Sequence, residues 1–501
     1  MSNVDSSFFI VGFLVYVGIM IFIGWYSSKG KTEGKNYLTG GAGLPMFLIF
    51  ATMGATLIGT GSAIGATRNG FASGWFGSAY GLGACLGILL LVWASNKIKA
   101  RSKGFITMSE EAQFLYDGNR NMKIVMGFMM FIVEIIWLGN HMNGGATYLA
   151  YITGLDPITA RVLTVLGFGA YVVIGGYLAV VWTDLIQLII LVLGFILIAA
   201  IAIPTAGGWE AISAAYATAG KSGSLSFYGV QTVGLMAVIS LVFTIFIPGL
   251  GTPTYRMRIY TSKDDKTANR ALIRSALLLL GFSFIPAIIG MAAFTIASSS
   301  ADPSAAAVLK TPDFAFAFVA TQILGPWLGL VFMIAGLSAT MSSGDSDAIA
   351  GVTILIQDIY PVFAKKALPE EKVKTWSRIG IVVTLTLAFF ATLFAKDVMG
   401  YINNVIGSII PGVSVAMFLG VFWKRVTWQG GLAAIFSGTL FGICYLSVPA
   451  FQNYIKGIFT GPAIAATIIS LVFAVIVTLA TKKVEVSEAE RLDMVIKSRS
   501  Y

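Results

Sequence analysis

Charged residues, cysteine and histidine are all scarce in this chain. Only 11% of its 501 residues are Asp, Glu, Lys or Arg, and it has two Cys and one His. A soluble protein of this length carries about 25% charged residues, so the composition excludes an ordinary water-soluble domain. Two distant Cys form no metal site by their spacing, and we interpret Cys85 and Cys444 as apolar filling. The chain also lacks a glycine-rich phosphate loop, a nucleophile elbow and an HExxH helix, which argues against an enzyme.

Long apolar runs are abundant. Hydrophobic residues make up 57% of the chain, and its mean hydropathy is +0.84. Such runs predict an all-α, polytopic membrane protein with about thirteen transmembrane helices. The first run has neither a basic leader nor a small-residue cleavage site, so we expect it to be a span and not a signal peptide. The expected spans are 8–27, 45–67, 75–95, 123–153, 157–178, 182–204, 230–255, 272–297, 328–357, 377–396, 398–423, 428–447 and 461–480.

The basic residues predict the orientation of the chain. Most of the 33 Lys and Arg residues fall on one side if residues 1–7 lie outside and the tail 481–501 lies in the cytoplasm. This asymmetry follows the positive-inside rule, so the net charge of +10 indicates membrane orientation and not nucleic-acid binding. The map leaves no Lys or Arg at midplane depth. Six basic residues are expected outside: Arg68, Arg161, Lys221, Lys310, Lys396 and Lys456.

One expected span is unusually polar. Residues 335–348 read AGLSATMSSGDSDA, which places hydroxyls and carboxylates within an apolar helix. Polar groups are costly in lipid, so they indicate function. Ala339, Ser342, Ser343 and Ser346 share one helix face, and neutral oxygens on one face suit a small hard cation. The alternative for the serines is bonding to carbonyls one turn earlier in their own helix.

Two other spans contain helix-breaking residues. Residues 55–65 read ATLIGTGSAIG, and residues 247–254 read IPGLGTPT. Glycine and proline weaken helices, so each span is predicted to unwind where it faces a cavity. The interrupted spans are the second and the seventh, so five spans separate them. This separation is typical of an inverted repeat of five helices, in which the two breaks meet at a transport site. The alternative is close helix packing through small residues.

Four motifs in sequence order resemble the sodium:solute symporter family, whose fold is an inverted five-plus-five helix repeat. The resemblance implies one transporter domain over residues 1–501, with a leading helix at 8–27, repeats at 45–204 and 230–423, trailing helices at 428–480 and a tail at 481–501. The motifs are Ala55-Thr56 with Ile64-Gly65 and Gly74; Trp182-Thr183-Asp184 with Gln187; Ala339 with Ser342-Ser343 and Asp358-Ile359-Tyr360; and Arg258 with Ser262-Lys263-Asp264.

The resemblance implies two ion sites. The first is a sodium site formed by the carbonyls of Ala55, Ile58 and Ala339 and the hydroxyls of Ser342 and Ser343. The second would use Asp184 and Ser346. Asp345 departs from the family there, because a Ser or Thr is usual at that position. It would add charge to a second sodium, take up a proton, or pair with a base near the inner mouth. Asp347 is a weaker ion candidate, and Asp184 alternatively has a structural role.

The resemblance also implies a solute site beside both breaks. Glu134, Trp137 and His141 share a helix face there, and a carboxylate in mid-span is a functional hypothesis with His141 as its expected partner. The alternative is that Glu134 only holds helices together, and that Asn143 serves close packing. The remaining solute candidates are Gly59, Thr60, Ser62, Thr252 and Thr254.

These observations predict a sodium-coupled secondary active symporter that imports a small polar organic solute, such as an amino acid or amine, by alternating access. The alternatives are a proton-coupled or uncoupled carrier of the same fold and a transporter-like membrane sensor. A channel is disfavoured because the polar groups cluster at helix breaks and do not form pore rings. We expect Na⁺ as the coupling ion, a multi-pass location in a bacterial cytoplasmic membrane, and neither nucleic acid nor an obligate protein partner.

Overall fold

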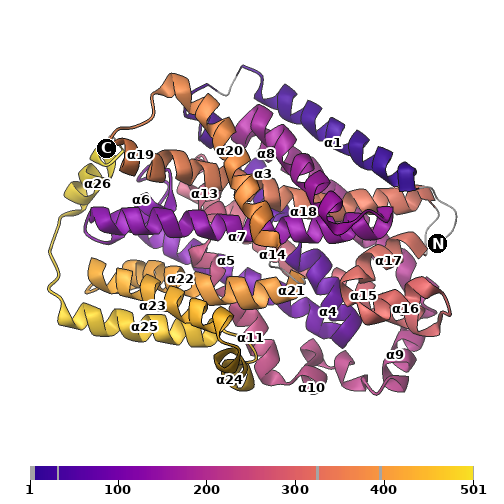
Figure 1. The fold of residues 1–501 in the computed structure, drawn as a ribbon. Helices are drawn as coiled ribbons and strands as arrows, with labels where there is room; N and C mark the ends of the chain where they lie inside the picture. The colour runs from indigo at the N-terminus through magenta and orange to yellow at the C-terminus, as the bar shows by residue number, and fades with distance from the viewer. Residues whose placement is uncertain (1–5, 31–32, 323–325, 394–397, 500–501) are drawn as a thin grey trace.

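The protein is a bundle of long helices, shown in the computed structural model of Figure 1. The structure describes residues 6–30, 33–322, 326–393 and 398–499. These residues contain no strand beyond a single β-bridge between Leu44 and Ser262. The long helices are α1 (Ser6–Ser28), α5 (Ala79–Ile98), α7 (Arg120–Thr153), α8 (Pro157–Thr205), α14 (Asp265–Phe282), α15 (Phe284–Ser299), α18 (Pro326–Ile354), α20 (Glu370–Thr392), α22 (Gly407–Phe422), α23 (Trp428–Ser447) and α25 (Ala463–Ala480).

Shorter helical segments connect or interrupt these helices. They are α2 (Asn36–Thr39), α3 (Met46–Leu57), η1 (Gly61–Gly65), α4 (Ala66–Ser73), η2 (Gly74–Ser78), α6 (Met108–Leu115), α9 (Gly208–Thr218), η3 (Ser222–Leu225), η4 (Phe227–Gly229), α10 (Val230–Val233), α11 (Leu235–Phe246), α12 (Pro248–Gly251), α13 (Pro253–Thr261), α16 (Pro303–Lys310), η5 (Pro312–Phe314), α17 (Ala315–Gln322), η6 (Leu355–Ile359), α19 (Tyr360–Ala364), α21 (Val398–Gly400), η7 (Tyr401–Ile406), α24 (Pro449–Phe459) and α26 (Glu488–Lys497).

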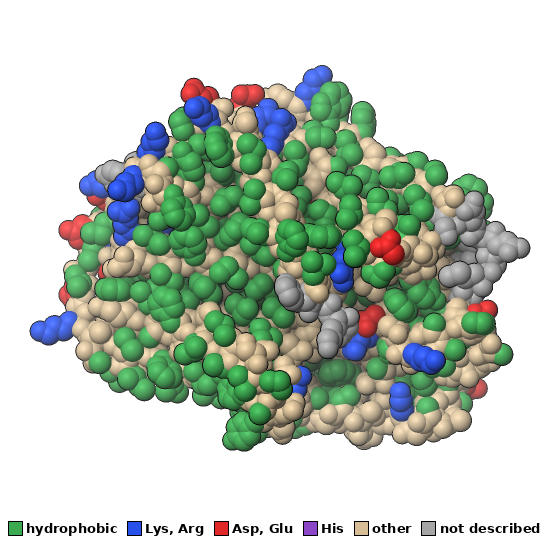
Figure 2. Space-filling view, in the orientation of Figure 1, with side chains coloured by type: hydrophobic (Ala, Val, Ile, Leu, Met, Phe, Trp, Pro, Cys, Tyr) green, Lys and Arg blue, Asp and Glu red, His purple; other side chains and the backbone are tan. Residues whose placement is uncertain are grey.

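The outer surface is apolar around the middle of the bundle. Figure 2 shows hydrophobic side chains over most of this face, with many of the Lys and Arg side chains at its left and upper left. Peripheral helices carry large exposed apolar residues, such as Phe22 on α1 and Ile476 on α25. A surface of this kind is stable against lipid chains and unstable in water, so the prediction of a multi-pass membrane protein is confirmed.

Helix α8 contains a reversal of the chain. Its 49 residues are about 70 Å of helix, far more than a bilayer core of about 30 Å requires. The backbone leaves helical geometry at Gly176, with φ 61° and ψ −150°. Before it, Phe168 packs against Gly344 of α18, whereas after it Gly194 packs against Ala335. Tyr171 and Asp184 both lie at the level of residues 345 and 346 of α18, so the two halves run in opposite directions.

The exact number of spans stays a prediction. Ten helices in the described part of the chain are long and apolar enough to cross a membrane, or eleven if the bent pair α11–α13 is one span. The expected total of about thirteen differs for two reasons. The fifth and sixth expected spans lie within α8, and the second begins with the short helix α3, which ends at its break. Residues 1–5, Lys31 and Lys396, used in the orientation argument, lie outside the described residues.

Both interrupted spans break where the sequence indicates. Helix α3 ends at Leu57, and Ile58 has non-helical φ and ψ of −88° and 62° before η1 begins at Gly61. Helix α12 ends at Gly251, and Thr252 is extended. The axis of α13 is bent by 46° from that of the preceding helical segment 235–251. Helix α18 packs against α3, α7, α8 and α13, so it faces both breaks. The polar residues of α18 therefore lie at the centre of the protein.

Candidate functional site

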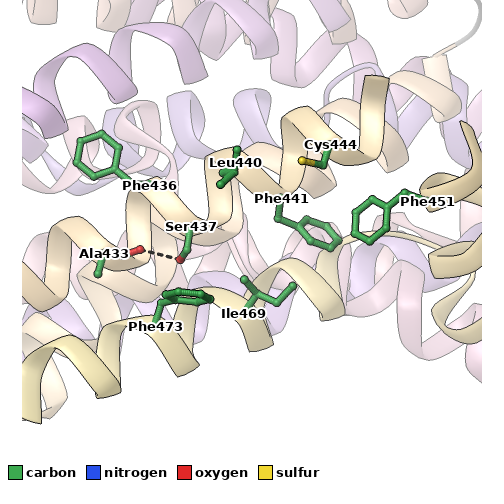
Figure 3. A pocket seen from close by; sticks show the side chains of 9 residues that line it. All are labelled: Ala433, Phe436, Ser437, Leu440, Phe441, Cys444, Phe451, Ile469 and Phe473. Atoms are coloured by element: carbon green, nitrogen blue, oxygen red, sulfur yellow. Dashed lines mark hydrogen bonds between the residues drawn. The ribbon is translucent and has the colours of Figure 1, made fainter. Parts of the chain in front are cut away.

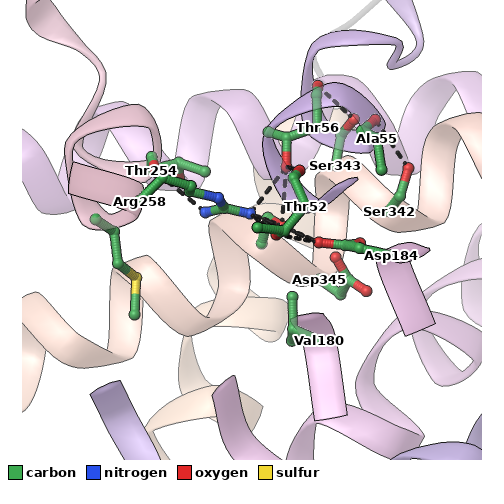
Figure 4. A network of polar contacts seen from close by, with 12 residues as sticks. Thr52, Ala55, Thr56, Val180, Asp184, Thr254, Arg258, Ser342, Ser343 and Asp345 are labelled. Atoms are coloured by element: carbon green, nitrogen blue, oxygen red, sulfur yellow. Dashed lines mark hydrogen bonds and ion pairs between the residues drawn. The ribbon is translucent and has the colours of Figure 1, made fainter. Parts of the chain in front are cut away.

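The break after α3 exposes backbone carbonyls to two hydroxyls of α18. The Ser342 Oγ donates to the carbonyl of Ala55 at 3.1 Å, and the Ser343 Oγ donates to the carbonyl of Thr56 at 2.9 Å. The Ser343 Oγ also lies 3.4 Å from the Ala339 carbonyl in its own helix. All five residues are buried, and Figure 4 shows the two serines pointing at the end of α3. Backbone and hydroxyl oxygens from two elements thus meet at one point.

Glycine allows the two chains to approach this closely. A Cβ on Gly59 would lie 2.4 Å from the Ser343 Oγ and 2.9 Å from the His141 Cε1. No real Cβ tolerates these contacts, so a side chain at position 59 would push the break away from α18 and α7. Within the break, the Ser62 Oγ donates a hydrogen bond of 2.8 Å to the carbonyl of Leu57, which stabilises the unwound segment.

The structure brings together most of the predicted sodium ligands. Ala55, Ala339, Ser342 and Ser343 converge, and Ile58 is the non-helical residue of the break. Sequence reasoning missed the Thr56 carbonyl, which is the acceptor for Ser343. The alternative of serine back-bonding holds only for the longer contact of Ser343 to Ala339. Uncharged oxygens at an unwound helix are a donor set that fits Na⁺, although their role stays a prediction.

An arginine occupies the region predicted for a second ion. Arg258 of α13 is fully buried, and its Nη2 donates to Thr52 at 2.9 Å and to Thr56 at 2.8 Å. The same nitrogen lies 2.5 Å from the Ser346 Oγ and 3.7 Å from the Asp184 Oδ2. Asp184 in turn accepts a hydrogen bond of 2.5 Å from the Thr52 hydroxyl. Figure 4 shows the guanidinium reaching from α13 toward Asp184, with Asp345 beside that carboxylate.

Two basic residues expected in a cytoplasmic segment are buried inside the protein, which the sequence did not predict. Arg256 and Arg258 were assigned to a cytoplasmic segment, yet both side chains have 0% exposure. Arg256 pairs with Glu111 of α6, whose other oxygen accepts a hydrogen bond from Tyr260 at 2.5 Å. A charge count along the chain cannot detect this arrangement, because the partners that make burial tolerable lie on other helices.

Asp345 is bonded by a tyrosine that the sequence did not indicate, while its roles toward a second sodium or a proton stay predictions. Its Oδ2 accepts a hydrogen bond of 2.6 Å from the Tyr171 hydroxyl, and it pairs with no cytoplasmic base among the described residues. Tyr16 and Gln187 form a further polar chain nearby, in which Gln187 Nε2 donates to the Tyr16 hydroxyl at 3.0 Å. Asp184, Asp345 and Ser346 are thus brought together, but with Arg258 among them.

Four of the nine predicted solute residues, Gly59, Trp137, His141 and Thr252, line a small cavity between the two breaks. Its volume is about 10 Å³, close to the space of one water molecule, so the solute region is closed here. The His141 ring lies 3.0 Å from the Thr60 hydroxyl through Nδ1 and 3.4 Å from Asp347 through Nε2. The lining residues are Thr56, Leu57, Gly59, Tyr80, Trp137, His141, Thr252, Tyr255 and Asp347.

Glu134 does not bond His141, contrary to expectation. Two helical turns separate the residues, and Glu134 instead accepts from the Thr254 backbone N–H at 2.9 Å and its hydroxyl at 2.8 Å. The same hydroxyl lies 2.9 Å from Asp347 Oδ1. Ser62 points into the first break. Asn143 accepts from Arg161 at 3.4 Å and does not line the cavity.

Sequence reasoning missed several residues of this region. Tyr80 and Tyr255 line the cavity, yet nothing in their local pattern distinguishes them from other apolar-face aromatics. Asp347 had a signal, since it is an acid within an apolar helix, but it was weighed only as an ion ligand. It lies about 40° around the helix from Ser343 and about 140° from Ser342, and its carboxylate is bonded by Thr254 at the second break.

A second hollow has no such chemistry. It has a volume of about 450 Å³ and lies between α23, α24 and α25 (Figure 3). Its walls are almost entirely apolar, and the Ser437 hydroxyl in it bonds to the carbonyl of Ala433 at 2.6 Å. A groove of this kind between peripheral helices suits lipid chains and offers no group for an ion or polar solute.

The fold and the buried polar site define a membrane transporter of the class in which broken helices meet at mid-membrane. The model of the sodium:solute symporter family matches residues 37–438. The chain therefore belongs to the sodium:solute symporter family, as the sequence motifs predicted. Its relatives in this family are transporters and not enzymes.

Named relatives match nearly the whole chain at low identity. The osmoregulated proline transporter OpuE of Bacillus subtilis is 24% identical, with 95% of each chain covered. The sodium/glucose cotransporter of Vibrio parahaemolyticus is 25% identical, over 90% of this chain and 87% of that protein. The sodium/proline symporter of Haemophilus influenzae is 23% identical, over 89% and 90%.

Solved structures share the fold. A Na⁺-coupled sialic acid symporter in a substrate-bound, outward-open state superposes with a TM-score of 0.75 at 18% identity, over 95% of this chain and 99% of that one. MhsT in complex with L-phenylalanine gives a TM-score of 0.51 at 19% identity, over 87% and 98%. The predicted all-α fold with an inverted five-plus-five repeat is thereby confirmed.

Proposed function

We propose that this protein is a sodium-driven symporter that imports a small polar organic solute by alternating access. One observation carries the proposal: the hydroxyls of Ser342 and Ser343 meet the carbonyls freed at the end of α3. The cavity for the solute begins at the same break, since Thr56, Leu57 and Gly59 line it. An ion and a solute bound on two sides of one unwound segment influence each other through that segment.

The coupling follows from what a cation would do between these oxygens. The serine hydroxyls now donate to the carbonyls and hold α18 against α3. A bound Na⁺ would instead take the carbonyls of Ala55, Ile58 and Ala339 and the lone pairs of Ser342 and Ser343. This fixes the break in one conformation and so favours solute binding beside it.

The region predicted for a second ion already holds a positive charge. The Arg258 guanidinium already bonds Ser346 and pairs with Asp184, so a second Na⁺ at Asp184, Asp345 and Ser346 must displace or share that charge. Asp345 is fully buried and its Oδ1 has no hydrogen-bond partner among the described residues, which supports proton uptake there, and so proton coupling, as the second candidate function.

Uptake into proteoliposomes tests the proposal. Purified protein would be given inward gradients of Na⁺, of protons, of both or of neither, with a panel of labelled sugars, amino acids and amines. We expect accumulation of at least one solute only with the Na⁺ gradient. Accumulation driven equally by protons without Na⁺ would favour the second candidate, and equilibration without any gradient would indicate an uncoupled carrier.

A further inference from the structure

Three buried polar atoms that line the central cavity have no hydrogen-bond partner among the described residues. They are the Asp347 Oδ2, the Thr252 Oγ1 and the Trp137 Nε1, on α18, at the second break and on α7. Their side chains are at most 5% exposed. The Asp347 Oδ2 is 3.4 Å from the His141 Nε2, which is too long for a good hydrogen bond. Buried polar groups without partners are costly, so three around one cavity are available to bind the polar groups of a solute when the cavity opens.

Within the described part of the chain, no Lys or Arg pairs with Asp347. Arg256 is paired with Glu111, and Arg258 is paired with Asp184. Glu134 and Asp347 share the hydroxyl of Thr254, which has only one proton and cannot donate to both carboxylates. Glu134 is also bonded by the backbone N–H of Thr254, so Asp347 is the less satisfied of the two.

The walls of the cavity suit an organic cation. Three aromatic side chains line it together with Asp347, namely Tyr80, Trp137 and Tyr255. The faces of tyrosine and tryptophan attract ammonium groups, and they do so more strongly where water is excluded. The indole of Trp137 stacks on His141, with ring centroids 6.2 Å apart and 16° between planes, which holds it in place.

We propose that the solute carries a protonated amine, and that Asp347 is the group that binds it. The inference rests on the proposed function, because it assigns the solute class of the same transport site. The ammonium group donates to the Asp347 Oδ2 beside the aromatic faces. The Trp137 N–H and the Thr252 hydroxyl bind an oxygen elsewhere on the solute. A neutral solute of the same shape leaves Asp347 buried without a counter-charge, which is costly.

Ligand-induced stabilisation of purified protein tests this binding without requiring transport. The probes are pairs that differ in one group: proline and tetrahydrofuran-2-carboxylate, ethanolamine and ethylene glycol, and putrescine and 1,4-butanediol. Each is titrated in saturating Na⁺ while the melting temperature is recorded. We expect at least one amine to stabilise the wild type, and its oxygen counterpart to bind about 10- to 100-fold more weakly. The three pairs distinguish zwitterionic from purely cationic solutes.

Variants then assign the effect to Asp347. Asp347→Asn should lose the preference for the amine, and Asp347→Glu should keep part of it. Asp302→Asn is the matched control, because Asp302 caps α16, does not line the cavity, and Asn caps equally well. If Asp347→Asn does not fold, Trp137→Phe supplies the test, since it keeps an aromatic face and should weaken binding by removing the N–H donor.

The outcomes separate this inference from the proposed function. Equal binding of amines and their oxygen counterparts, or an unchanged preference in Asp347→Asn, would overturn the role of Asp347 even if sodium-driven uptake is measured. A solute without an amine that is accumulated with Na⁺ would do the same. Amine binding that depends on Asp347, without any sodium-driven uptake, would support the inference and refute the symport proposal.

Discussion

At the scale of single residues, two neighbouring serines and one arginine have the clearest consequences. Ser342 and Ser343 bond different carbonyls of α3, so each has its own part in joining α18 to the break. Their spacing was visible in the sequence, and so was the glycine-rich break that they face. The partner of Asp184 was not visible, because Arg258 lies 74 positions away along the chain.

We expect Ser343→Ala to raise the Na⁺ concentration for half-maximal uptake by about 5- to 100-fold, since it removes one oxygen from a small ligand set. The helix should persist, because alanine has high helix propensity. Sodium titration of uptake in proteoliposomes provides the measurement. Ser437→Ala on α23, whose hydroxyl bonds only to its own helix, is the control and should behave as wild type. Unchanged sodium dependence in both Ser343→Ala and Ser342→Ala would show that these hydroxyls are not sodium ligands.

Arg258 and Asp184 should behave as a pair. Arg258→Met leaves buried carboxylates uncompensated, and Asp184→Asn removes the negative charge that faces the guanidinium. We expect Arg258→Met alone to cost about 3–5 kcal/mol of stability and the double variant to cost less than the sum of the two single variants. The measurement is a double-mutant cycle: the melting temperatures, in detergent, of the wild type, the two single variants and the double variant. Strictly additive effects would mean that the two charges do not interact.

At the scale of elements, the backbone breaks position the site. Breaks after α3 and α12 bring the carbonyls and Thr254 to α18, and the reversal at Gly176 brings both halves of α8 against it. The sequence predicted these interruptions, because Gly and Pro act on their own backbone. It placed the turn of α8 between residues 178 and 182, whereas the chain reverses at Gly176.

Gly176→Ala should prevent correct folding of α8. The position has φ 61° and ψ −150°, which residues with a Cβ rarely adopt, and a Cβ there would lie 2.4 Å from the carbonyl oxygen of Tyr37. We expect a sharp loss of monodisperse protein in size-exclusion chromatography. The control is Gly281→Ala in α14, where a Cβ meets no atom within 4 Å. If the two variants give equal yield and stability, the reversal does not depend on glycine.

At the scale of the whole molecule, basic segments that are far apart in sequence gather at one end. The backbone N–H of Arg101 donates to Asp265, the Lys374 side chain pairs with Glu33, and Arg499 of the tail pairs with Glu110. These segments were all predicted to be cytoplasmic. Their clustering agrees with a common side, although the side of the membrane stays a prediction.

Cysteine labelling in intact cells tests that orientation. Single cysteines introduced in place of Lys263 and Lys366, in a variant with Cys85 and Cys444 replaced by Ala, should react with a membrane-impermeant maleimide only after permeabilisation. A cysteine in place of Lys310 should react without it. Labelling of the cysteines at positions 263 and 366 in sealed cells would contradict the predicted orientation.

The sequence alone determined the class of protein, the interruptions of its helices and the serine pair, because hydropathy, glycine and helical periodicity act over a few neighbouring residues. Only the tertiary structure decided which charges lie inside. Arg258 is buried because Thr52 and Thr56 of α3, Asp184 of α8 and Ser346 of α18 surround it. Asp347 faces the cavity because the second break brings Thr254 to it. A buried charge depends on partners from several helices, and sequence spacing does not encode where those helices meet.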